Sequence, residues 1–345
     1  MSSAAATPPP RVSVLMTMFN AARDVGSAVE SVRAQTFADF EFIVVDDGST
    51  DDSAALVESC GDARIRLVRN AANKGQTACL NQGLALACGE WIARQDADDL
   101  SHPARLERQL AAVAEDASLA LVGCQAWIID GAGAFEGTLN LPLGPESIEW
   151  AALFENPFIH TAAFFRREVV AQLGGYDESF RICQDYELWE RVLRRHRGRN
   201  LPERLVRYRH TAQSLSQAAR ETVHAEALRV RTALWSRAFP PDAFSVVEKA
   251  AFLRGGGRAS PHEAAAFSRL CARVRAAYLQ ARPQLAGDRD FRRTTALQHA
   301  QIGRDALAGN LCAGLAELAR AFAIDPALLL DLAGDRLTGP RRFAR

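Results

Sequence analysis

Three carboxylates end a short apolar run between residues 91 and 99. Asp96 and Asp98 are separated by one residue, and Asp99 follows directly. Carboxylates this close repel one another, and a bound cation offsets that repulsion. The Asp-X-Asp pair therefore offers oxygen ligands for Mg²⁺ or Mn²⁺, ions that also hold substrate phosphates. The alternative interpretation is a helix start, because Ser101 is a good N-cap and carboxylates stabilise the first turn of a helix.

Two other predicted strands also end in polar residues. Residues 12–18 and 40–45 are rich in Val, Ile, Met and Phe, and polar residues follow each of them. Strands that alternate with helices predict an α/β fold, in which a mostly parallel mixed sheet has helices on both faces and binds its ligand at the carboxyl ends of its strands. We therefore expect the three polar ends, 17–20, 46–51 and 96–99, to converge on one cleft.

The composition limits the classes of partner and compartment. The chain has 345 residues and a formal net charge of zero, which argues against a general nucleic-acid binder. Its seven cysteines show no CxxC spacing, which favours buried thiols in a reducing compartment over a disulfide framework or a zinc site. The sequence shows neither a signal peptide nor a stretch that could span a bilayer. We expect a cytoplasmic protein, with the inner face of the membrane as a candidate location.

The amino-acid composition and the spacing of apolar residues change along the chain and predict three regions. Residues 1–10 are small and proline-rich and are expected to be disordered. The α/β pattern extends over residues 11–217. From residue 218 to residue 345 the chain is rich in Ala, Arg and Leu at helical spacing, which predicts an all-helical region that could form homo-oligomers or dock a partner. The glycines at 255–257 follow no strand and are interpreted as a linker within it.

Six motifs together resemble the family 2 glycosyltransferases, which have the GT-A fold. They are residues 14–20, 44–51, Asn73-Lys74-Gly75, Asn81-Gln82-Gly83, 93–99 and 184–189. The resemblance covers about residues 11–217 and implies a metal-dependent hexosyltransferase that uses Mn²⁺ or Mg²⁺. Such an enzyme moves a sugar, with inversion, from a nucleoside-diphosphate sugar donor to a hydroxyl acceptor. By family analogy, the acceptor is a glycan or a lipid-linked glycan of the cell surface.

The resemblance also implies which residues bind the donor. Thr17 and either Asp46 or Asp47 would contact the base and the ribose, although Asp-Gly-Ser is also a common turn. Lys74 lies on a glycine turn before a helix, where its charge and backbone N–H groups could meet a diphosphate, and its alternative is a solvated surface lysine. Five residues complete the implied nucleotide-sugar set: Asn20, Asn81, Arg94, Asp96 and His160.

The same resemblance assigns the chemistry to two carboxylates. Asp98, supported by Asp96, would hold the metal that bridges the diphosphate. Asp185 would be the base that takes the proton of the acceptor hydroxyl. Gln184 stands where the family usually has Glu, so the site loses one charge beside this base. The alternative for Asp185 is a simple helix N-cap.

Two histidines and an arginine run are further candidates. His160 follows Asn156-Pro157 on the acceptor side and could contact the acceptor or the diphosphate, or be an ordinary core residue. His210 lies in a segment, 208–214, that resembles a flexible closing loop, and it is a candidate metal ligand. The arginines between residues 191 and 199 could meet anionic lipid headgroups, but favourable charges at a helix C-terminus are the default interpretation.

Two other functions are alternatives to a glycosyltransferase. A sugar nucleotidyltransferase would need a glycine-rich loop directly after the first strand, and residues 17–20 contain no glycine. A non-catalytic nucleotide- or glycan-binding protein could dispense with either Asp98 or Asp185, and both are present. An active glycosyltransferase is therefore the leading interpretation.

Overall fold

The computed structural model describes residues 8–210, 219–254, 261–307 and 311–325. Most of the expected disordered N-terminus, the end of the 208–214 segment and the glycine linker at 255–257 lie outside these ranges. The chain divides into two compact units. The first contains residues up to 136 and residues 158–214, and the second contains residues 137–157 and those from 215 onwards.

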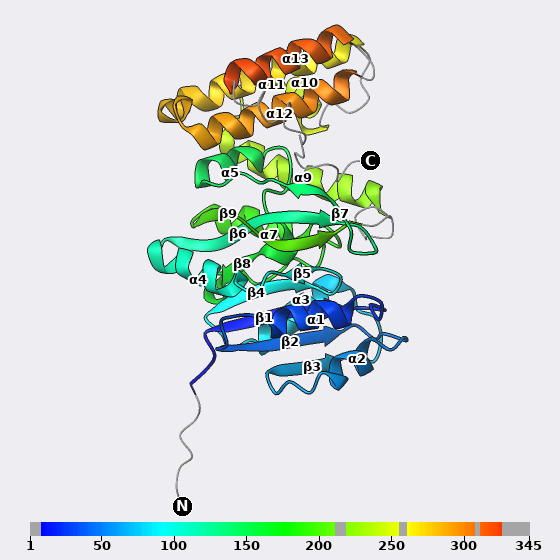
Figure 1. Cartoon of the computed structure of the whole chain (residues 1–345). Coiled ribbons are helices and arrows are strands. Elements are labelled where there is room, and N and C mark those ends of the chain that lie inside the picture. Colours follow the sequence, from blue (N-terminus) through cyan, green and yellow to red (C-terminus); the bar gives the residue numbers. More distant parts are fainter. Residues whose placement is uncertain (1–7, 211–218, 255–260, 308–310, 326–345) are drawn as a thin grey trace, which may run out of the picture. The chain divides into compact units, whose positions relative to one another are not determined.

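The first unit is built on a mixed sheet with the strand order β3-β2-β1-β4-β8-β6-β9-β5, with β7 paired to β6 (Figure 1). Strands β1 to β4 are mutually parallel, β8 runs antiparallel to both β4 and β6, and β9 runs parallel to β6 and antiparallel to β5. The strands are β1 (Val12–Met18), β2 (Phe40–Asp46), β3 (Ile65–Arg69), β4 (Trp91–Asp96), β5 (Leu100–Ser101), β6 (Leu119–Ile129), β7 (Phe135–Leu139), β8 (Phe164–Arg166) and β9 (Arg197–Arg209). This arrangement confirms the predicted α/β fold.

Helices follow the strands as the alternating pattern predicts. They are α1 (Val25–Arg33), α2 (Ser53–Ser59), α3 (Gln76–Leu86), α4 (Arg105–Glu115), the 3₁₀ turn η1 (His160–Ala162), α6 (Arg167–Gln172) and α7 (Gln184–Leu193). Every residue of β1 is buried, and α1 turns Val25, Val29 and Val32 into the core. Glycine lets α3 pack closely on β1, because a Cβ at Gly83 would lie 2.1 Å from Cδ1 of Leu15.

Two local predictions were wrong near the end of β4. The helix expected from Ser101 begins at Arg105, and Leu100–Ser101 instead forms β5, which pairs with the end of β9. The Ser101 side chain bonds to Gln95 and Arg105 rather than capping a helix. The sequence of residues 205–208 also suggests an edge strand, but these residues form the end of β9, which lies between β6 and β5. In both places a long-range strand pairing replaces a local signal.

The second unit is helical, as expected, but it includes a segment that the sequence analysis placed in the first domain. Its elements are α5 (Pro145–Ala151), α9 (Arg220–Ala238), α10 (Val246–Arg254), α11 (Pro261–Ala281), the 3₁₀ turn η2 (Pro283–Ala286), α12 (Arg289–Leu307) and α13 (Leu311–Ile324). Trp150 of α5 packs against the rings of Tyr278 and Phe291. The Asp290 carboxylate accepts the backbone N–H of Gly144 at 2.7 Å, at the start of α5. The boundary between the two units falls within β7, and residues 140–157 fold with the helices of this unit.

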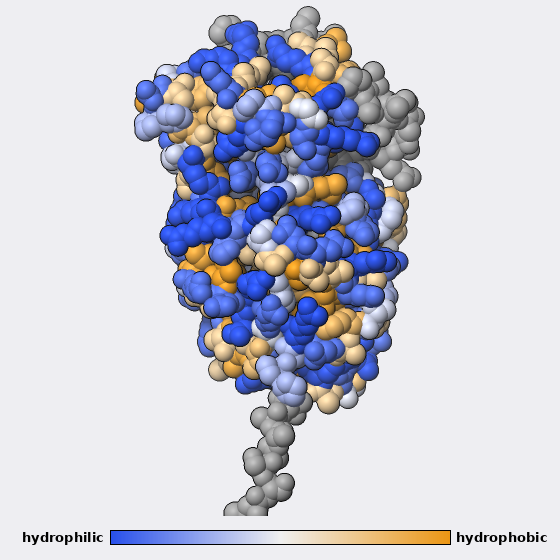
Figure 2. Space-filling model, turned by 90° about the vertical axis from the view of Figure 1, so that its left-hand side faces the viewer, coloured by the Kyte–Doolittle hydropathy of each residue, from blue (hydrophilic) through white to orange (hydrophobic). Residues whose placement is uncertain are grey.

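The surface carries mainly hydrophilic side chains on the face drawn in Figure 2, and its apolar residues occur there in small groups. Within the described ranges, no helix is both long enough and apolar enough to cross a bilayer.

Candidate active site

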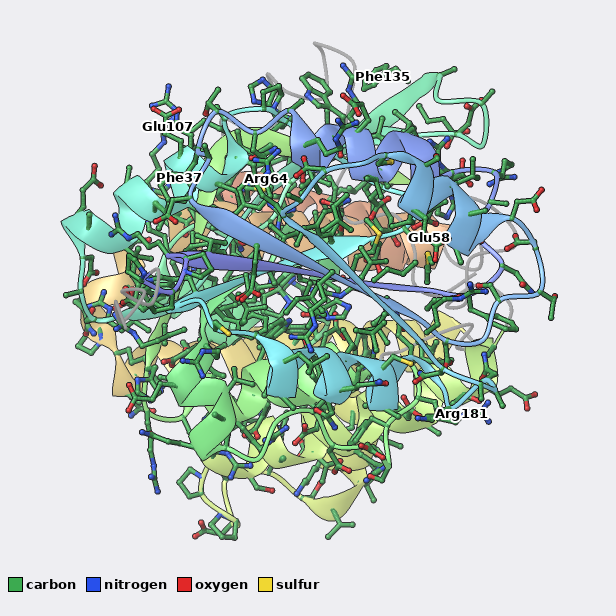
Figure 3. The ribbon with its side chains drawn as sticks, turned by 90° about the horizontal axis from the view of Figure 1, so that it is seen from below. Phe37, Glu58, Arg64, Glu107, Phe135 and Arg181 are labelled. Atoms are coloured by element: carbon green, nitrogen blue, oxygen red, sulfur yellow. The ribbon has the colours of Figure 1, made fainter. Side chains whose placement is uncertain are left out.

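The three polar strand ends lie side by side at one edge of the sheet. In the register of the parallel strands, Thr17 of β1 is level with Asp96 of β4, and Met18 is level with Asp46 of β2. The convergence expected from the sequence is therefore present. Figure 3 shows β1 and β2 crossing the centre of the view, with α1 on one side of them and α3 on the other.

Arg94 lies beneath this edge and is fully buried. Its Nη2 donates to Oδ1 of Asp96 at 2.5 Å and to the Thr17 hydroxyl at 3.4 Å. Nε and Nη1 have no hydrogen-bond partner among the residues that the structure describes. Arg94 therefore fixes the first carboxylate of the Asp-X-Asp pair and keeps unused donor groups.

Asp98 and Asp99 follow in the turn after β4. Burial, together with the neighbouring Asp96 carboxylate, raises the pKa of Asp98 to about 6. Burial and both neighbouring carboxylates also raise the pKa of Asp99, whose Oδ1 accepts the backbone N–H of Arg209 at 2.6 Å. The Arg209 side chain donates to the backbone oxygen of Asp98 at 2.8 Å. This turn therefore concentrates negative charge that is only partly compensated.

The donor set fits a metal that is completed by substrate. In the described ranges, no three His, Cys, Asp or Glu side chains gather into a ready-made metal site, so Asp96, Asp98 and His210 form no such cluster. Mg²⁺ and related ions are commonly held by one or two carboxylates, with substrate phosphates and water filling the other positions. The pKa of Asp98 is raised by its burial and by nearby carboxylates, and a cation would relieve both effects. Asp98 and Asp96 thus suit a diphosphate-bound ion.

Asp46 and Asp47, the predicted nucleotide-binding residues at the end of β2, accept hydrogen bonds from the backbone of neighbouring loops. Asp47 accepts the backbone N–H groups of Lys74 and Gly75, each at 2.8 Å, one with each carboxylate oxygen. Asp46 accepts the N–H of Ser49 at 3.0 Å. Asp47 therefore positions the turn that carries Lys74, and the Lys74 side chain remains exposed.

Asn20 and Asn81, two of the predicted nucleotide-sugar-binding residues, form hydrogen bonds with the backbone of other segments. Asn20 has a positive φ of 49° and accepts the backbone N–H of Thr50 at 2.9 Å, which ties the end of β1 to the loop after β2. Asn81 of α3 bonds to both the N–H and the carbonyl oxygen of Tyr176, each at 2.9 Å. The Tyr176 hydroxyl in turn lies 3.0 Å from Nε2 of His160.

Asp185 lies in the first turn of α7 and is 8 % exposed. Cys183 occupies the N-cap position, so Asp185 is not the cap residue. The preceding Gln184 donates to Oε1 of Gln76, at the start of α3, at 3.2 Å. This bond links the helix that carries Asp185 to the helix that follows the Lys74 turn.

The partly buried Tyr208 is affected by the charges of both the Asp-X-Asp turn and Asp185. Burial raises the pKa of Tyr208, and the charges of Asp99, Asp96, Asp98 and Asp185 raise it further. Asp185 and the Asp-X-Asp turn therefore lie near enough to one side chain to affect its pKa, although 87 positions of sequence separate Asp98 from Asp185. Sequence reasoning missed Tyr208, Tyr176 and Arg209 as scaffold residues, because their partners are distant in sequence.

Comparison with known proteins agrees with this geometry. The sequence profile described as glycosyl transferase family 2 matches residues 13–174, which include the Asp-X-Asp pair but end before Asp185. EpsE of Bacillus subtilis is 35 % identical over 206 residues, which span 58 % of this chain and 73 % of EpsE. This chain belongs to glycosyl transferase family 2. It is a glycosyltransferase.

Two further relatives illustrate the family. The amylovoran biosynthesis glycosyltransferase AmsE of Erwinia amylovora is 30 % identical over 202 residues, which span 57 % of this chain and 75 % of AmsE. The mannosyltransferase PcManGT of Pyrobaculum calidifontis, solved with GDP-Man and Mn²⁺, superposes with a TM-score of 0.52 at 21 % identity and covers 88 % of each chain. At that identity the match shows a shared fold.

The arginine run of this glycosyltransferase is largely paired. Arg191 binds Glu187 at 2.6 Å, Arg194 binds Glu190 at 2.6 Å, and Arg199 lies 3.9 Å from Glu115. The helix α7 also ends at Leu193, so part of the run belongs to β9 rather than to a helix C-terminus. These pairings favour a structural role for the run.

Proposed function

We propose that the chain is an inverting, metal-dependent glycosyltransferase that moves a sugar from a nucleoside diphosphate to a hydroxyl of a glycan or lipid-linked acceptor. One observation carries the proposal: the Asp96–Asp98 turn ends a strand at the polar edge of the sheet, and Asp185 lies at the start of α7, which Gln184 ties to the helix after the Lys74 turn. An inverting displacement needs a base on one face of the sugar and a charge-accepting group at the leaving diphosphate on the other. The two acidic ends of the site suit these two roles.

Asp185 acts as the base in this proposal. Its carboxylate takes the proton of the acceptor hydroxyl as that oxygen attacks the anomeric carbon. The new glycosidic bond forms while the bond from that carbon to the diphosphate oxygen breaks, and the nucleoside diphosphate leaves with the bonding electrons. The Gln184–Gln76 hydrogen bond holds the start of α7 during this step.

Asp98 would hold the divalent ion with help from Asp96, whose orientation Arg94 fixes. When bound, the ion offsets the negative charge that develops on the leaving diphosphate. Lys74, placed by the Asp47 carboxylate at the start of α3, adds a positive charge for the same phosphates. The PcManGT complex with GDP-Man and Mn²⁺ supports this part of the proposal by analogy.

The relatives suggest the pathway. AmsE is named for the biosynthesis of amylovoran, and on that basis we place this enzyme in the synthesis of a cell-surface polysaccharide. A cytoplasmic location fits the free thiols of the described cysteines, which are Cys60, Cys79, Cys88, Cys124, Cys183 and Cys271.

The direct test is thermal stability of the full chain with UDP, GDP, dTDP or CDP, each with and without Mn²⁺. A ligand at one hundred times its dissociation constant stabilises a protein by about 2.7 kcal/mol, which is a readily measured shift. We expect a shift with one nucleotide that requires the metal. No shift with any nucleotide would contradict the proposal, and binding without turnover of any sugar donor would favour a non-catalytic binding protein.

A further inference from the structure

His160 and Tyr176 form a close side-chain pair in the first unit. Nε2 of His160 lies 3.0 Å from the Tyr176 hydroxyl, and the two rings meet edge to face at a centroid separation of 5.7 Å. Tyr176 is 2 % exposed, whereas His160 is partly exposed. In the part of the chain that the structure describes, Nδ1 of His160 makes no hydrogen bond. One ring nitrogen is therefore held by the protein and the other remains available.

The position of Tyr176 is set by α3. Asn81 clamps the Tyr176 backbone through both its amide atoms, each at 2.9 Å. The preceding Gly175 has a φ of 77°, and a Cβ there would lie 2.7 Å from Oδ1 of Asn81. Only glycine allows this approach without strain. The phenol is thus fixed by the same helix that begins at the Lys74 turn.

His160 lies between the two chemical ends of the site. Its neighbour Thr161 accepts the backbone N–H of Asp96 at 2.9 Å. On the other side, the His160 ring packs 6.5 Å from the ring of Trp189, which is one helical turn after Asp185 on α7. In a displacement with inversion, the sugar lies between the leaving diphosphate and the base. Through Thr161 and Trp189, His160 is thus near the carboxylates assigned to both faces of the sugar.

The surroundings of His160 are rich in unused donors. Among the described residues, Nε and Nη1 of Arg94 and Nε1 of Trp189 are buried without a hydrogen-bond partner. These donors make the surroundings of His160 polar, but their accessible surface is too small for a ligand to reach them. Burial and the Arg94 charge also lower the pKa of His160, which keeps the imidazole neutral.

We propose that His160 donates a hydrogen bond from Nδ1 to a hydroxyl oxygen of the donor sugar, and that Tyr176 is the positioning residue that keeps the proton on Nδ1. A neutral imidazole has one donor nitrogen and one acceptor nitrogen. When the Tyr176 hydroxyl donates to Nε2, the proton must reside on Nδ1. This inference rests on the proposed function, because it assumes a nucleotide-sugar donor.

The first test reads the tautomer without any ligand. Nitrogen-15 NMR of the histidine-labelled full chain distinguishes imidazoles protonated at Nδ1 from those protonated at Nε2, and H160N identifies the His160 signals by their loss. We expect the Nδ1–H form in the unaltered protein and a shift towards Nε2–H in Y176F. The matched control is Y278F, a buried tyrosine of the helical unit, which should leave these signals in place. An Nε2–H form in the unaltered protein would overturn the inference.

The second test separates the sugar from the nucleotide. Dissociation constants are measured in Mn²⁺ for UDP and GDP and for UDP-glucose, UDP-GlcNAc and GDP-mannose. We expect Y176F to weaken binding of the nucleotide sugar that the unaltered enzyme prefers by roughly 3- to 10-fold, with its nucleoside diphosphate unaffected. H160Q, whose amide reaches the Nε2 position, should show the same loss. H160N, whose amide lies near the Nδ1 position, should recover most of the affinity and no longer respond to Y176F.

The outcomes separate this inference from the proposed function. Equal losses for the diphosphate and the nucleotide sugar in Y176F would overturn the sugar contact while leaving the proposed function intact. If the unaltered chain bound none of these five nucleotides and neither dTDP nor CDP, the proposed function and the sugar contact would both be overturned.

Discussion

The buried Arg94 guanidinium lies 2.5 Å from the Asp96 carboxylate, at the point where β4 reaches the candidate active site. Arg94 is fully buried, while the Asp96 side chain is 22 % exposed. This ion pair neutralises the buried Arg94 charge inside the sheet. It also fixes the orientation of the Asp96 carboxylate, the first of the Asp-X-Asp pair. Replacing Arg94 with an uncharged residue tests both the charge balance and the orientation of Asp96.

We expect R94M to destabilise the protein by about 3 kcal/mol, because breaking a buried ion pair leaves one charge uncompensated. Urea unfolding measures this change. The control is R199Q, since Arg199 and Glu115 are exposed and 3.9 Å apart, and its loss should stay below about 1 kcal/mol. Similar losses in both variants would contradict a special role for the Arg94 pair.

Asp98 and Asp185 should differ in what they contribute. D98A is expected to abolish metal-dependent nucleotide binding, because it removes the residue that we propose as the principal metal ligand. D185N keeps the shape of the site but cannot accept the acceptor proton, so turnover should fall by about 10²- to 10⁴-fold while nucleotide affinity is retained. Calorimetric titration with the nucleotide and a steady-state transfer assay measure the two effects. Equal loss of binding in both variants would contradict these roles.

Asp47 and Lys74 should also separate stability from binding. Asp47 accepts two backbone N–H groups before α3, so D47A should cost about 1–2 kcal/mol in stability and also weaken nucleotide binding by releasing the Lys74 turn. K74A should weaken binding of nucleoside diphosphates with little change in stability, because the Lys74 side chain is exposed. If D47A were as stable as the unaltered protein, its role in positioning this turn would be wrong.

The sequence was a good guide wherever a signal was local. Strand periodicity located β1, β2 and β4, and the rule for parallel sheets placed Thr17, Asp46 and Asp96 at one edge. It failed where distant segments decide the outcome. Ser101 pairs with Val206 instead of starting a helix, and residues 140–157 fold with the helical unit.

The site shows the same division between local and distant signals. Motifs identified the carboxylates, but they gave no indication that Asp47 would be occupied by backbone N–H groups. Nor could they reveal that Asn81 would clamp Tyr176, 95 residues further along the chain. Such partners are set by tertiary packing, which short motifs do not encode.

The close packing of α3 on β1 provides a last test, because α3 carries Asn81 and follows the Lys74 turn. In G83A, the new methyl group would meet Cδ1 of Leu15 at 2.1 Å, so we expect a net destabilisation of about 1–3 kcal/mol despite the better helix propensity of alanine. The matched control is G26A in α1, where nothing lies within 4 Å of the added Cβ, and it should be neutral or up to about 1 kcal/mol more stable. Trimming the clashing side chain in G83A/L15V should recover part of the loss, because the two sites are in contact and their effects are therefore not additive. Urea unfolding of the four proteins decides the matter: if G83A behaved like G26A, contact with Leu15 would not be what requires glycine at this position.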